Sequence, residues 1–106
     1  SYWLSDEWTY RMAVWCNIIG ITDIPEGIPL QLIEEVIIND FRGHSFAEIE
    51  LALKMCALGE FSEPIESYNR LNIPFLGKVM KAYRKFRKDA ANKYEEIKLT
   101  LLPVKQ

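Results

Sequence analysis

The stretch Pro74–Leu101, PFLGKVMKAYRKFRKDAANKYEEIKLTL, is the longest uninterrupted helical pattern in this 106-residue chain. At about 100° per residue, its apolar side chains fall within one broad arc. The arc consists of Phe75, Leu76, Val79, Met80, Tyr83, Phe86, Ala90, Tyr94, Ile97 and Leu101. The spacing predicts one helix of about 27 residues, ~40 Å long at 1.5 Å per residue. A core this small cannot cover such a length, so we expect one end of the helix to project.

Basic residues gather on another side of the same predicted helix, in an arc about 120° wide. We call Lys78, Lys81, Arg84, Lys85 and Lys88 the basic arc. Bases on one face can approach a polyanion together and neutralise its phosphates with release of counterions. A solvated surface that binds nothing shows the same pattern, and we expect no exposed aromatic residue to interleave with these bases.

Arg87 is the exception among the bases of this helix, because it lies about 20° from Leu76 and therefore inside the apolar arc. An arginine there can bury its stem and present a planar guanidinium to a carboxylate. We expect a structural ion pair of Arg87 with an acid from the first half of the chain, with Glu48 and Glu50 as candidates.

The net charge of −2 conceals a division between the two parts of the chain. Residues 1–73 contain twelve acids and four bases, whereas residues 74–106 contain nine bases and three acids. Such asymmetry indicates a nucleic-acid or acidic protein partner. The alternative is that the acidic first part neutralises the basic helix within the fold.

Three further helices are expected before Pro74. The first begins with Ser5 as its N-cap, buries Trp8 and Trp15 on one face, and ends at Gly20. The second has Pro29 at its first position and stops at Gly43. Its Val36-Ile37-Ile38 segment has β propensity, but a strand without a partner would be marginal, so helix is preferred.

The third expected helix, Ser45–Leu58, opens with the strongest local signal in the chain. Ser45 and Glu48 have the spacing of a capping box, in which each side chain binds a free backbone amide. Apolar residues surround the helix almost completely, which predicts the most buried helix, with only the i,i+4 pair Glu50 and Lys54, and Glu48, near the surface. The segment 59–73 is expected to be a connection with one helical turn around Ile65–Leu71.

The two ends of the long helix also carry signals. Asn72 with Pro74 is expected to open it, and Pro103 to end it. The predicted fold is an all-α compact bundle of about four helices with a long basic C-terminal helix. Its 106 residues, about half of them apolar, suit a single helical domain. We allow for a longer natural chain, since the sequence starts with Ser1 and not with Met.

Sites for chemistry are sparse. The five glycines are scattered and form no phosphate-binding loop, and the single histidine, His44, precedes a helix where a polar residue commonly faces solvent. Cys16 and Cys56 are expected to be buried free thiols, and too few ligands exist for a zinc site. We therefore expect no enzyme, no catalytic residue, no cofactor, no metal and no small-molecule substrate.

The order of features from Phe46 to Arg87 resembles small helical proteins of bacteriophages and mobile elements. The resemblance lies in Phe46–Leu53, the stop at Gly59, the turn Tyr68–Leu71 and the run Leu76–Arg84. Some of these proteins look like replication accessory factors of the helicase-loader type. The resemblance implies a binding role in DNA replication, although the missing phosphate loop departs from the ATP-dependent loaders.

The leading hypothesis is a non-enzymatic helical binding module that acts in phage-type DNA replication through the basic arc. The alternative is a protein-interaction or oligomerisation domain, in which Tyr94, Ile97 and Leu101 continue the apolar arc beyond the core to bind another chain or another copy. A small enzyme stays open only if a catalytic part lies outside the sequence. We expect a soluble, cytoplasmic protein, since no apolar run approaches the length of a membrane span and no signal peptide is evident.

Overall fold

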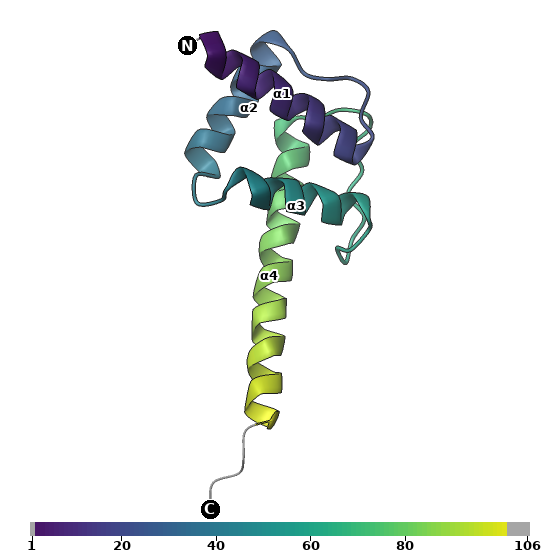
Figure 1. The fold of residues 1–106 in the computed structure, drawn as a ribbon. Helices are drawn as coiled ribbons and strands as arrows, with labels where there is room; N and C mark the ends of the chain where they lie inside the picture. The colour runs from purple at the N-terminus through teal and green to yellow at the C-terminus, as the bar shows by residue number, and fades with distance from the viewer. Residues whose placement is uncertain (1, 102–106) are drawn as a thin grey trace, which may run out of the picture.

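The computed structural model describes residues 2–101 and contains four α-helices (Figure 1). They are α1 (Tyr2–Ile19), α2 (Gly27–Asp40), α3 (Phe46–Ala57) and α4 (Ile73–Leu101). Within the described residues the only extended pairing is one isolated bridge between Asp23 and Arg70, so the prediction of an all-α fold is confirmed. Pro103, the expected end of the long helix, lies outside the described residues.

The first three helices gather around the N-terminal half of α4, and the rest of α4 extends away from them (Figure 1). α1 packs on α3, while α3 and α2 both contact α4. We call α1, α2, α3, the connections between the helices and the first part of α4, to residue 83, the body. The molecule is elongated as a result, with extents of 65 × 29 × 18 Å.

The core of the body forms where one face of each helix meets the others. The side chains of Met12, Trp15, Leu53, Leu76 and Met80 are fully buried there. Trp8 and Phe46 meet edge to face, with ring centroids 5.3 Å apart, beside Trp15. Both tryptophans therefore belong to the core, as their position beside Met12 on one face predicts.

Local signals at several helix ends are confirmed. Ser45 and Glu48 form the complete capping box at the start of α3. The Asn72 side chain accepts a hydrogen bond from the Phe75 amide at 2.9 Å and caps α4. Gly20, with φ of +86°, ends α1 in the left-handed conformation that glycine adopts most easily.

Three other helix boundaries were predicted wrongly. α1 begins at Tyr2, not after Ser5, because no helix-breaking residue stands before Ser5 to stop the helix from continuing. α2 begins at Gly27, so Pro29 occupies its third position, and α2 ends at Asp40, before Gly43. Proline is tolerated anywhere in the first turn, since the amides there have no partner within the helix.

The prediction that the apolar residues around α3 are buried on all its sides is wrong. Ile49, Ala52, Leu53 and Met55 are buried, but Leu51 is 48% exposed and Leu58 75% exposed, because no element covers their side of the helix. Glu50 is instead half-buried, and its Oε1 accepts hydrogen bonds from Arg11 and Trp15, each at 3.1 Å. The tryptophan and the arginine satisfy the carboxylate, so it does not need to reach solvent or Lys54.

The connection between α3 and α4 contains no helical turn, contrary to prediction. Tyr68 and Asn69 adopt positive φ values of 53° and 61°, which are incompatible with a continuing right-handed helix. The Asn69 Oδ1 atom accepts a hydrogen bond from the Thr22 amide at 2.8 Å and so ties this connection to the one between α1 and α2. Asparagine tolerates the left-handed conformation because its short polar side chain can bond locally.

Candidate nucleic-acid interface

The five residues of the basic arc lie on one side of α4, between residues 78 and 88, and all five are exposed. At 1.5 Å per residue they span ~15 Å along the helix axis. The row begins alongside the body and ends where α4 leaves it (Figure 1). The structure therefore presents the basic arc on an accessible helix face, at the edge of an otherwise acidic body.

Arg84 is the member of the arc that the body holds most firmly. Its Nε donates a hydrogen bond to His44 Nε2 at 3.2 Å, and its guanidinium lies over the Phe41 ring, 5.4 Å from the centroid. Since His44 accepts through Nε2 in this arrangement, a neutral ring carries its proton on Nδ1. That buried Nδ1 atom lies 3.5 Å from Glu48 Oε2. His44 thus positions an arginine and is not free to act as a base through Nε2.

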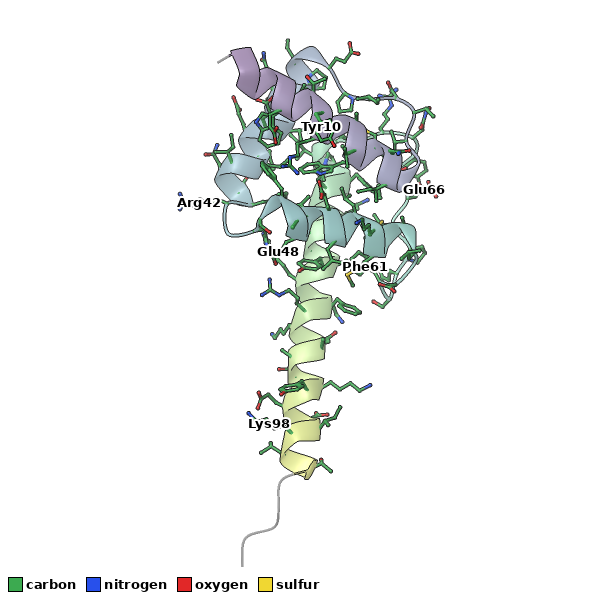
Figure 2. The ribbon with its side chains drawn as sticks, in the orientation of Figure 1. Tyr10, Arg42, Glu48, Phe61, Glu66 and Lys98 are labelled. Atoms are coloured by element: carbon green, nitrogen blue, oxygen red, sulfur yellow. The ribbon has the colours of Figure 1, made fainter. Side chains whose placement is uncertain are left out.

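Glu48 of α3 binds α4 close to where α4 leaves the body, and Figure 2 labels it there. Its Oε2 accepts hydrogen bonds from Arg87 Nη1 at 2.8 Å and from the Tyr83 hydroxyl at 3.1 Å. This is the ion pair of Arg87 with Glu48 that the helical phase led us to expect. The arginine side chain remains 59% exposed, and its guanidinium lies 5.9 Å from the Tyr83 ring centroid.

The surroundings of Glu48 change its acidity. Desolvation by itself would raise the pKa of this carboxyl, but hydrogen bonds from Tyr83, Ser45 and His44 and the charge of Arg87 outweigh it and lower the pKa. The pKa of Tyr83 is raised, first by burial and then by its bond to the carboxylate. The site therefore holds a charged glutamate and a neutral tyrosine at neutral pH.

The remaining bases of the arc differ in their contacts. Lys85 pairs with Asp89 at 2.9 Å on the exposed helix surface, a contact that solvent weakens. Lys78, Lys81 and Lys88 form no ion pair with any residue of the described chain. No member of the arc pairs with an acid of residues 7–73, so the acidic first part of the chain does not neutralise the arc by direct contact.

An open groove of about 740 Å³ runs between α4 and the connection 60–68. Its lining contains three residues of the basic arc and further residues from the connection. On the α4 side it is lined by Lys78, Lys81 and Lys85, and on the other by Glu60, Glu63 and Glu66. Figure 2 labels Phe61 close to α4 and Glu66 farther out on the same connection. The three glutamates are spaced three residues apart in the sequence. In an irregular connection that spacing does not predict that they lie opposite the lysines of α4.

Tyr68 lines the same groove and is 81% exposed, which corrects the view that no aromatic side chain accompanies the bases. Phe61 and Phe86 meet across the groove, with ring centroids 6.4 Å apart. An exposed aromatic ring beside lysines is the arrangement on which single-stranded bases stack. Sequence reasoning missed it because the path of the connection, and not helical spacing, places Tyr68 in the groove that Lys81 also lines.

Other chemistry is not assembled in the described part of the chain. Burial raises the pKa of the Cys16 thiol to about 11, and burial also raises that of Cys56, so neither favours a reactive thiolate. Residues 2–101 contain no group of histidine, cysteine and carboxylate side chains able to hold a metal ion. Across the same residues, no helix is both long and apolar enough to cross a membrane.

Comparisons of the chain with protein-family models, curated proteins and solved structures give no match.

Proposed function

We propose that this chain is a non-enzymatic helical binding module that binds nucleic acid through the basic arc of α4. The observation that carries the proposal is the exposure of all five bases on one helix face without an ion pair to any acid of residues 7–73. Among the described residues, Lys78, Lys81 and Lys88 have no ionic partner that a phosphate would have to displace. A role in phage-type DNA replication belongs to the same proposal and rests on the resemblance over residues 46–87.

The residues that line the groove affect whether single-stranded or duplex DNA binds more tightly. The glutamates at 60, 63 and 66 repel phosphates close to the connection, whereas Tyr68 offers a ring for stacking in the groove that Lys81 also lines. Duplex DNA would approach the five bases of the arc from the side away from the connection, where these glutamates do not stand between them and the phosphates. Single-stranded DNA could in addition place a base on Tyr68, so we expect it to bind more tightly than duplex of the same length.

The test is a salt titration of fluorescently labelled single-stranded and duplex DNA, measured by anisotropy between 50 and 200 mM salt. Engagement of up to five phosphates on duplex gives a log-log slope as steep as about −4 to −5. Replacing Lys78, Lys81 and Lys88 together with Gln removes three contacts and should flatten that slope by about 2.7.

The matched control is the triple variant of Arg42, Lys54 and Arg70 to Gln, which removes the same charge from exposed positions of the body. It should retain the slope of the unaltered protein. Tyr68→Ala should weaken binding of single-stranded DNA and leave duplex binding unchanged. Absence of binding at 50 mM salt, or equal loss in both triple variants, contradicts the proposal, because the arc would then contribute nothing beyond net charge.

A second candidate function, protein interaction or oligomerisation, is favoured by a different observation. Beyond the body, α4 exposes large apolar side chains, among them Tyr94 at 64% and Ile97 at 47%. These residues lie on another face of α4 from the basic arc. The two functions are therefore compatible on one helix.

A further inference from the structure

The distal part of α4, residues 84–101, extends beyond the body, and we call it the shaft (Figures 1 and 2). Every side chain that the structure describes in it, from residue 84 to 100, is exposed. A single helix of this length is marginally stable in water, since tertiary packing normally supplies most helical stability. An apolar face that continues past its core marks a contact with another molecule.

Four exposed residues form the apolar face of the shaft, and we call them the shaft stripe: Phe86, Ala90, Tyr94 and Ile97. Together with Val79 and Tyr83 they recur at intervals of eleven residues, as from Val79 to Ala90 and from Phe86 to Ile97. Eleven residues in three turns correspond to about 3.67 residues per turn, close to a straight α-helix. The stripe thus stays on the face that Val79 and Tyr83 bury in the body. A second helix can lie straight along Ala90, Tyr94 and Ile97, whereas Phe86 also contacts Phe61 of its own chain.

The stripe has nearly the same pattern in both directions along the helix. Two antiparallel copies can be aligned about a centre between Ala91 and Asn92. Phe86 of one copy then lies at the level of Ile97 of the other, and Ala90 lies within one residue of the level of Tyr94. In an antiparallel pair of two copies, each large Tyr94 would therefore face the small Ala90 of the other copy. Such a self-complementary surface is what a two-fold symmetric contact requires.

The position of the body selects the antiparallel arrangement. The body covers α4 on the same face as the shaft stripe, since Phe75, Leu76 and Val79 are buried there. Two parallel helices that met through their stripes would bring both bodies into the same space between them. In the antiparallel arrangement the bodies lie at opposite ends, and residue 101 of each copy reaches the level of residue 82 in the other, where the body begins.

Charges beside the stripe agree with this arrangement. With the same centre, Asp89 of one copy lies near the level of Lys93 of the other, along one edge of the stripe. Arg84 and Lys98 carry like charges near the ends of the contact. Arg84 is already turned toward Phe41 and His44 of its own body, which directs its charge away from the second copy.

We infer that the shaft stripe is a docking surface for a second copy of this chain, which binds antiparallel along residues 84–101. The contact covers ~27 Å of helix, at the small end of specific interfaces, so the dimer should form reversibly at micromolar concentration. The basic arc stays accessible in the dimer because it lies away from the stripe. Self-association does not depend on nucleic-acid binding, and its test contains no DNA.

The experiment is sedimentation of the purified full chain over a range of concentrations, with two variants that differ only in helix face. Ile97→Glu places a charge in the shaft stripe, and Leu99→Glu places the same charge on the opposite face, where Leu99 is 68% exposed. We expect the unaltered chain and Leu99→Glu to dimerise with similar constants. Ile97→Glu should remain monomeric at concentrations at least tenfold higher, and the circular dichroism of the body should be retained in all three.

Small-angle X-ray scattering of the dimer then distinguishes the orientation. Two protomers of 65 Å that share the shaft give a maximum dimension of about 100 Å when antiparallel, whereas a parallel pair stays near the length of one protomer. A monomer at all concentrations, a dimer that Ile97→Glu leaves intact, or a dimer no longer than one protomer would each overturn the inference. DNA binding by the basic arc would be unaffected by any of these results.

Discussion

Arg87 Nη1 lies 2.8 Å from Glu48 Oε2, at the last point where the body contacts α4. The Tyr83 hydroxyl binds the same carboxylate oxygen, one helical turn earlier. Beyond Arg87 no residue of the described shaft forms a hydrogen bond or ion pair with the body. Glu48 therefore marks the boundary between the part of α4 that the core stabilises and the part that is exposed.

Stability should depend on pH through Glu48. Its pKa is lowered in the folded protein, so the carboxylate stabilises the fold above the ordinary pKa of a glutamate, and this contribution is lost as pH falls through the lowered value. Glu48→Gln retains an acceptor for the capping box but removes the charge. Urea titrations from pH 7 to pH 3 should show the variant less stable at neutral pH and equal to the unaltered protein in acid.

The control for this prediction is Glu35→Gln, at an exposed position of α2 with no ion pair in the described structure. Its stability should follow that of the unaltered protein at every pH. If Glu48→Gln behaves like this control, the contacts with Arg87 and Tyr83 contribute nothing to folding.

Leu53 and Leu51 provide a matched test of the packing of α3. Leu53 is fully buried, so Leu53→Ala leaves a cavity and should cost about 2–5 kcal/mol of unfolding free energy. Leu51→Ala removes the same atoms from a side chain that is 48% exposed, and should cost less than about 1 kcal/mol. Urea denaturation of both variants measures the difference, and equal costs would place α3 in a different rotation about its axis.

The two cysteines should react at different rates with a thiol reagent. Cys16 is buried with a pKa of about 11, whereas Cys56 is half-buried and its Sγ lies 3.8 Å from the Ile65 carbonyl oxygen. The thiolate is the reactive form, so Cys56 should be modified first in the native protein. Mass spectrometry of partly alkylated protein identifies the site, and denaturation in urea should make the two rates similar.

Backbone protection should change along α4. Amides around Val79 and Met80 lie in the core and should exchange slowly, while those of the shaft should exchange fast in dilute solution because its side chains are exposed. Hydrogen exchange at two protein concentrations measures this. Slow exchange of residues 84–100 in the dilute monomer would mean that the shaft is stable without a second helix.

Much of this fold follows from short-range patterns in the sequence. The length of α4 and the separation of its basic and apolar faces are set by a repeat of 3.6 residues per turn, and the capping box by a spacing of three residues. The phase of α4 also placed Arg87 within reach of Glu48. Such features depend on backbone geometry that each segment carries with it.

Tertiary structure decided the rest, because it depends on residues far apart in the sequence. The burial of Glu50 needs Trp15 and Arg11 from α1, and the exposure of Leu51 reflects the absence of a covering element on that side of α3. Tyr68 reaches the groove beside Lys81 through left-handed residues of an irregular connection, which no helical or strand period describes. Desolvation and pairing of these side chains are set by packing between segments, so only the folded chain determines them.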